Sequence, residues 1–157
     1  NGRIFVTTGD LISELEVQAN FKNKAANIGG ALSIKENSDV QIKIKVRDPQ
    51  SLNHHGDNPQ VTRVDLIVGD VTGISSDLTK DRNYTTKVEE RFYVEEMKKE
   101  GDYLIMNYTL KDVHHSMYLR VRGTNNTYEL EPAKDHTGEN PWNDLWFYSN
   151  PIFLEIK

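Results

Sequence analysis

Five histidines are the side chains in this sequence best suited to binding a transition metal or moving a proton. Four of them form adjacent pairs, His54 with His55 and His114 with His115, and the fifth is His136. Neighbouring residues of a strand point to opposite faces, so neither pair can place both rings on one metal ion unless its loop kinks. No H-E-x-x-H, G-x-S-x-G or phosphate-cradling glycine loop accompanies them. We therefore expect solvated loop histidines and no catalytic, cofactor-binding or metal-ligating residue, with a zinc or other metal site as the alternative.

A run of oxygen-bearing side chains near the C-terminal end could bind calcium, which prefers hard oxygen ligands. The run comprises Asp135, Glu139, Asn140, Asn143 and Asp144. Its spacing matches no EF-hand loop. An ordinary polar loop over residues 135–144 is the prediction, and a calcium site is the alternative.

An aromatic cluster overlaps this run and comprises Trp142, Trp146, Phe147 and Tyr148. Exposed rings on a β-sandwich can form a platform for sugar stacking, whereas such residues more often pack in a core or between domains. Asn140 can cap a helix and Pro141 suits its first position, so a short helical turn is expected here. On such a turn Trp142 and Trp146 would share a face. We expect Trp142, Trp146 and Tyr148 to pack, with an aromatic platform as the alternative.

Arg120 and Arg122 lie on the polar side of an expected strand whose other side is apolar. On a solvated face their ion pairs would contribute little to stability. The alternative hypothesis is a structural clamp, in which one of them binds Asp144 as a fork and pins the last segment of the chain.

Period-2 alternation is the strongest structural signal in the chain. Its clearest example spans residues 40–47, where four apolar residues alternate with polar ones without a break, which favours a half-buried strand over a helix. The residues expected in the core are Val40, Ile42, Ile44, Val46, Val64, Leu66, Val68, Leu119 and Val121. Roughly eight or nine strands separated by turns predict an all-β fold. We predict one antiparallel two-sheet β-sandwich of immunoglobulin-like type over residues 1–157, with a closed barrel second.

Composition excludes several functional classes. The formal net charge of −5 argues against a nucleic-acid binder, which usually carries a basic face. No apolar run approaches the ~18–20 residues that span a bilayer, so no membrane partner is expected. The absence of cysteine excludes disulfides, thiolate zinc sites and cysteine nucleophiles. It leaves the compartment open, and an extracytoplasmic bacterial location is compatible with it.

Both ends of the chain carry a family resemblance. Residues 1–12 read NGRIFVTTGDLI, residues 118–124 read YLRVRGT, and residues 141–153 read PWNDLWFYSNPIF. These stretches resemble the segments that follow the catalytic part of PHP-like (polymerase and histidinol phosphatase-like) metal-dependent phosphoesterases and close those proteins. The resemblance implies a C-terminal β-sandwich appended to a barrel-shaped metallohydrolase. The metal ligands of that family lie on the barrel and open with an H-x-H element, which this chain lacks, so none is transferred to it.

The leading hypothesis is a non-catalytic accessory domain of a larger metal-dependent hydrolase, packed on the catalytic domain of the parent chain. Because the sequence opens at Asn1 without an initiator methionine, we expect residues 1–157 to be the C-terminal piece of a longer protein. A carbohydrate- or cell-surface-binding sandwich is the alternative, and an exposed row of aromatic rings would favour it. An independent small enzyme is the third possibility and would need a cleft with a cluster of histidines and carboxylates.

Overall fold

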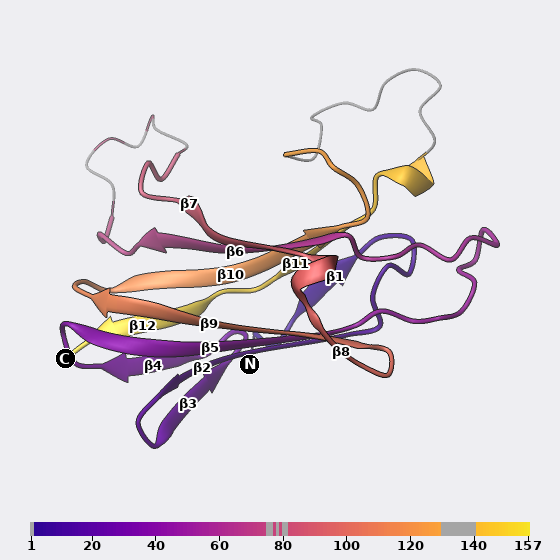
Figure 1. Cartoon of the computed structure of the whole chain (residues 1–157). Helices are drawn as coiled ribbons and strands as arrows, with labels where there is room; N and C mark the ends of the chain where they lie inside the picture. The colour runs from indigo at the N-terminus through magenta and orange to yellow at the C-terminus, as the bar shows by residue number, and fades with distance from the viewer. Residues whose placement is uncertain (1, 75–76, 78, 80–81, 130–140) are drawn as a thin grey trace.

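Two β-sheets lie face to face in the computed structural model of this chain, which describes residues 2–74, 77, 79, 82–129 and 141–157 (Figure 1). The described residues contain no α-helix, and their helical elements are two 3₁₀ turns, η1 (Val94–Glu96) and η2 (Pro141–Asn143). The all-β, two-sheet prediction is confirmed, and the closed barrel is wrong. No helix in the described ranges is both long and apolar enough to cross a membrane.

The smaller sheet, named here the β5 sheet, is antiparallel at every pairing. Its order is β3 (Lys24–Asn27), β2 (Glu14–Phe21), β5 (Ser38–Arg47), β9 (Tyr103–Val113) and β8 (Lys98–Glu100). The central strand β5 contains the unbroken alternation that predicted it. Its apolar residues face the other sheet, and Gln41, Lys43 and Lys45 point to the outside.

The larger sheet, named the β10 sheet, is built around two long antiparallel strands. Its strands are β1 (Phe5–Thr7), β4 (Ala31–Ile34), β6 (Arg63–Asp70), β7 (Lys87–Tyr93), β10 (Met117–Thr124), β11 (Trp146–Ser149) and β12 (Ile152–Ile156). β6 lies between β7 and β10. The other edge of β10 pairs with β12 near its start and with β11 near its end. β1 lies beside β11, and β4 lies beside β12.

One pairing departs from the predicted antiparallel sandwich, because β4 runs parallel to β12 with Leu32 opposite Leu154. The chain crosses from one sheet to the other at Gly29 and Gly30, since β3 belongs to the β5 sheet and β4 to the β10 sheet. Alternation in a four-residue strand indicates its buried face but carries no information on the direction of its neighbour. The β10 sheet is therefore mixed, and its strand order does not establish the immunoglobulin-like topology.

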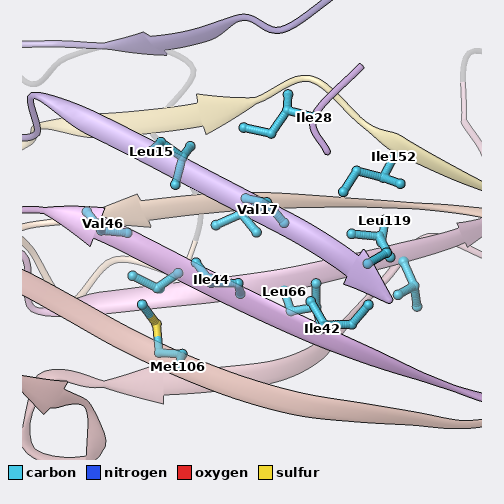
Figure 2. Close-up of a cluster of buried hydrophobic side chains, with 14 of the residues drawn as sticks. Leu15, Val17, Ile28, Ile42, Ile44, Val46, Leu66, Met106, Leu119 and Ile152 are labelled. Atoms are coloured by element: carbon cyan, nitrogen blue, oxygen red, sulfur yellow. The ribbon is translucent and has the colours of Figure 1, made fainter. Parts of the chain in front are cut away.

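The core fills the space between the two sheets. Figure 2 shows Ile42 and Ile44 of the β5 sheet lying against Leu66 and Leu119 of the β10 sheet. The nine residues predicted for the core are each at most 1 % exposed. Burying one such side chain contributes about 1.5–3 kcal/mol relative to leaving it in water, so these strands account for much of the folding free energy.

Two glycines of the β10 sheet make room for aromatic rings on the neighbouring strand. On the core side, Phe147 of β11 lies over Gly123 of β10, its direct partner in the register. On the outer side, Tyr118 of β10 lies over Gly69 of β6 in the same way. At both glycines an added Cβ atom would overlap the ring, so these positions are fixed by close approach rather than by backbone conformation.

Candidate functional site

The outer face of the β10 sheet carries charged side chains that are shielded from water. Residues of β6 alternate between the core and this face, which places Arg63, Asp65 and Ile67 on the outside. They are nonetheless only 4 %, 1 % and 4 % exposed. Since a buried charge needs a compensating partner, the contacts of Asp65 define the centre of the candidate site.

Three arginines bind the carboxylate of Asp65. Arg122 lies directly opposite it on β10, and its Nε donates to Oδ2 at 2.9 Å. Arg91 lies opposite it on β7, and its Nε donates to Oδ1 at 3.0 Å. The Nε atom of Arg63, two residues away on β6, lies 3.3 Å from Oδ1. These four residues, named here the arginine cluster, join three adjacent strands through one carboxylate.

The segment after β10 covers the arginine cluster. Nη2 of Arg63 donates to the carbonyl oxygen of Tyr128 at 2.6 Å, and Nη2 of Arg122 donates to that of Glu129 at 2.9 Å. The carboxylate of Glu129 accepts from Nη1 and Nη2 of Arg91 at 2.8 and 2.6 Å. These bonds raise the pKa of the Arg91 guanidinium and lower the pKa of Glu129, so both groups are charged at neutral pH.

Trp146 packs against the arginine cluster and is 1 % exposed. The centroid of its ring lies 5.9 Å from Cζ of Arg63 and 5.6 Å from Cζ of Arg122, within cation–π range. Its Nε1 donates to Oδ1 of Asp144 at 2.6 Å, and Nδ2 of Asn126 donates to the same oxygen at 2.6 Å. Trp146 thus joins β11 to the arginine cluster and to the turn that follows β10.

The expected clamp between Asp144 and Arg120 or Arg122 is replaced by other contacts. Arg122 binds Asp65, while Asp144 accepts from Trp146 and Asn126, and Arg120 is exposed. The register is the physical reason. Antiparallel pairing puts Asp65 of β6 directly across from Arg122, whereas Asp144 lies just before β11. Arg122 thus contacts a buried carboxylate, that of Asp65, through both Nε and Nη2.

The predicted aromatic group divides into two stacks. Trp142 belongs to η2 and stacks on His55 with ring centroids 4.5 Å apart. Tyr148 is half-buried and stacks on Trp146 with centroids 6.2 Å apart. Because η2 ends at Asn143 and Trp146 begins β11, the two tryptophans do not share the helical face that their spacing predicted.

The described histidines lie in exposed positions. His55, beside the exposed His54, has Nδ1 2.8 Å from a carboxylate oxygen of Asp57. His114 and His115 face different carboxylates, whose oxygens lie 3.2 and 3.1 Å from their Nε2 atoms. Within the described residues, no three histidine, aspartate or glutamate side chains are placed to hold one metal ion.

Part of the calcium hypothesis falls on residues that the structure does not describe. Asp135, Glu139 and Asn140 lie outside the described ranges, as does His136 of the histidine set. The calcium site in the loop 135–144 therefore stays an alternative to the polar loop.

A second feature of the outer face was missed by sequence reasoning. Large apolar side chains are exposed at Ile4 and Val6, at the β1 edge, and at Phe153 of β12, by 57 %, 60 % and 40 %. Val6 lies opposite Tyr148, and Phe153 lies opposite Tyr118, both half-buried. We call these five residues the outer-face patch. The signal was available, because Ile4, Phe5 and Val6 are consecutive, which puts apolar residues on both faces of one short strand.

No family model, curated protein or solved structure matches this chain.

Proposed function

We propose that this chain is a non-catalytic accessory domain, an immunoglobulin-like β-sandwich that packs on the catalytic domain of a larger metal-dependent hydrolase of the PHP-like phosphoesterase type. The outer-face patch is the surface that makes this contact. The single observation that carries the proposal is the exposure of three large apolar side chains, Ile4, Val6 and Phe153, on one face of the β10 sheet.

The contrast between the two outer faces supports a docking role for the patch. The outer face of the β5 sheet carries charged and polar side chains that pair with one another, as in the contact of Arg47 with Glu14 at 2.8 Å. Such a face is well solvated. Exposed apolar groups with polar neighbours are typical of protein interfaces, and covering them gains roughly 25 cal/mol per Å² of apolar surface. The outer-face patch has this composition, with the exposed Arg120 on the neighbouring strand β10.

The arginine cluster supports the proposal by making this face rigid. Tyr148 of the patch lies opposite Arg122 of the cluster, and Val6 lies opposite Tyr148 in turn. Asp65 and its three arginines cross-link β6, β7 and β10, and β10 carries Tyr118 of the patch and pairs with both β11 and β12. A preorganised surface loses less side-chain and backbone entropy on association, which favours a stable contact between domains.

Calorimetry on the full-length gene product tests the proposal. Val6→Ser and Phe153→Ser together should cost the isolated chain no more than about 1–2 kcal/mol, because Val6 is mostly exposed and Phe153 is partly exposed. In the full-length product the same change should separate one coupled unfolding transition into two. Leu52→Ser is the control, since Leu52 is an exposed apolar residue of a loop outside the patch. An unchanged transition in the double variant would contradict the proposal.

Carbohydrate binding is the second candidate, and one observation favours it. Tyr118 lies flat over Gly69 with Phe153 opposite it on β12, so two aromatic rings are neighbours on the outer face. Sugar rings stack on such surfaces. Binding to a glycan panel that is abolished by Phe153→Ser, without loss of stability, would replace the docking function with this one.

The accessory role also makes a prediction about activity. The isolated chain should not hydrolyse p-nitrophenyl phosphate, with or without added manganese. Turnover that depends on the metal and is lost when His114 and His115 are changed to alanine would contradict the prediction and point to an independent enzyme.

A further inference from the structure

The β5 sheet has a strand edge that is only half covered. β3 pairs with β2 over residues 18–21, whereas β5 runs along the other side of β2 over residues 14–20. Residues 14–17 of β2 therefore have a strand partner on one side only among the described residues. An edge of this kind presents backbone N–H and C=O groups to an added strand.

The register identifies which backbone groups point to this edge. Phe21 and Lys24 flank the two-residue turn of the β2–β3 hairpin, in which Lys22 has φ of 53°, so they form a hydrogen-bonded pair. The N–H and C=O groups of successive strand residues point to alternate sides of the strand. Those of Leu15 and Val17 therefore point to the same side as those of Phe21. The N–H and C=O groups of Leu15 and Val17 thus continue the line that β3 begins.

A groove of about 480 Å³ lies along this edge. Its apolar lining comes from Phe5, Leu15, Val17 and Ile28. Figure 2 shows Ile28 next to Leu15 and Val17, on the side of β2 that faces away from β5. A smaller hollow of about 230 Å³ shares Ile28 with it and continues along β3. The space has the position and the apolar floor that an additional strand beside β2 would need.

The charge of the groove indicates the chemistry of its occupant. Arg3, Lys43 and Lys45 line it, and Glu16 is the one carboxylate among the lining residues that the structure describes. Lys43 and Lys45 point outward from β5, on the same face as Glu16 of β2. Positive charge on the outer side and apolar residues on the inner side match a strand that alternates acidic and apolar side chains.

We propose that this groove binds an extended acidic segment of a partner protein as an added strand along residues 14–17 of β2. The segment spans about four residues, because a strand rises about 3.3 Å per residue. Its backbone pairs with Leu15 and Val17, its apolar side chains enter the apolar lining, and its carboxylates face Arg3 and Lys43. The Lys45 ammonium lies over the Tyr103 ring, 3.8 Å from its centroid. The groove adjoins the outer-face patch along residues 3–6 but is lined by other residues, so this binding activity goes beyond the proposed docking function.

A synthetic peptide tests the proposal directly. The probe is acetyl-Val-Glu-Val-Asp-Val-Glu-amide with a fluorescent label, titrated with the 157-residue chain and followed by anisotropy. We expect saturable binding, and slower hydrogen exchange of the Leu15 and Val17 amides by at least about tenfold. A peptide with lysine in place of its acidic residues, and one with N-methylated backbone amides, should not bind.

Charge variants of the chain separate specific binding from general attraction. Lys43→Glu with Lys45→Glu should weaken binding of the probe about tenfold or more, since both changes put repulsive charges beside the groove. Lys111→Glu is the matched control, because Lys111 is an exposed lysine of β9 that does not line the groove. It should leave the affinity within about twofold.

Three results would overturn the proposal. The first is the absence of saturable binding at millimolar peptide. The second is binding that survives N-methylation of the peptide or the double lysine change. The third is self-association of the chain that protects the Leu15 and Val17 amides without any peptide, which would assign this edge to a second copy of the chain.

Discussion

Removing the charge of Asp65 is the perturbation with the largest expected effect on this fold. Asp65→Asn keeps the size of the side chain but leaves the guanidinium groups of Arg63 and Arg122 without their carboxylate. Those side chains are 5 % and 8 % exposed, so water cannot replace the lost partner. Removing one partner of a buried ion pair costs about 3–5 kcal/mol, a large part of the 5–15 kcal/mol typical of a domain. Arg91 is less affected because it keeps Glu129.

Urea unfolding followed by tryptophan fluorescence measures this cost, with an unchanged m-value as evidence that the same two states are compared. Glu129→Gln is the matched control. The Glu129 side chain is 67 % exposed, so solvent screens its pair with Arg91 and the pair should contribute little to stability. Arg122→Met should also cost less in the Asp65→Asn background than in the unmodified chain, because the two residues are coupled. A cost below 1 kcal/mol for Asp65→Asn, or additive effects, would refute a buried and coupled cluster.

Three further changes test the core and one buried carboxylate. Ile44→Ala should cost about 2–5 kcal/mol in the same assay, since Ile44 is 1 % exposed, and a neutral result would contradict its position between the sheets. Gly123→Ala should cost about 1–3 kcal/mol, because the new methyl group would meet the ring of Phe147. Burial raises the pKa of Asp48, so the folded state loses stability as pH rises from about 3.9, the ordinary pKa of an aspartate, through the raised pKa of the folded state. Asp48→Asn should therefore stabilise the chain at pH 7 while keeping the hydrogen bond from the Val61 amide, and the gain should vanish below about pH 3.9.

The sequence was sufficient to predict the layers because alternation reports directly on burial. Val40, Ile42, Ile44 and Val46 of β5 face the core as their alternation requires, and so do Val64, Leu66 and Val68 of β6. Alternation shows which residues of a strand are buried, however, and not the direction in which the neighbouring strand runs. The parallel pairing of β4 with β12 depends on where the chain crosses between the sheets, and no local pattern records that crossing.

The sequence offered two interpretations of Arg120 and Arg122, a solvated face and a clamp on Asp144. In the structure Arg122 binds Asp65, and a buried charge on the outer face of a central strand needs such a partner. The clamp hypothesis named Asp144 as the carboxylate partner because Asp144 lies within the aromatic segment of the sequence. Strand register decides it instead, and it places Asp65 opposite Arg122 and Arg91. The helix signal at Pro141 produced only a three-residue turn, since the strand β11 begins at Trp146.

Hydroxyl-radical footprinting of the outer-face patch is the most direct test of the docking function. The labelling rates of Ile4, Val6 and Phe153 are compared between the isolated chain and the full-length gene product, with the exposed Leu52 as an internal reference. If the patch packs on a catalytic domain, the three rates should fall at least about fivefold in the full-length product while that of Leu52 stays the same. Equal labelling of the patch in both samples would contradict the proposed accessory role.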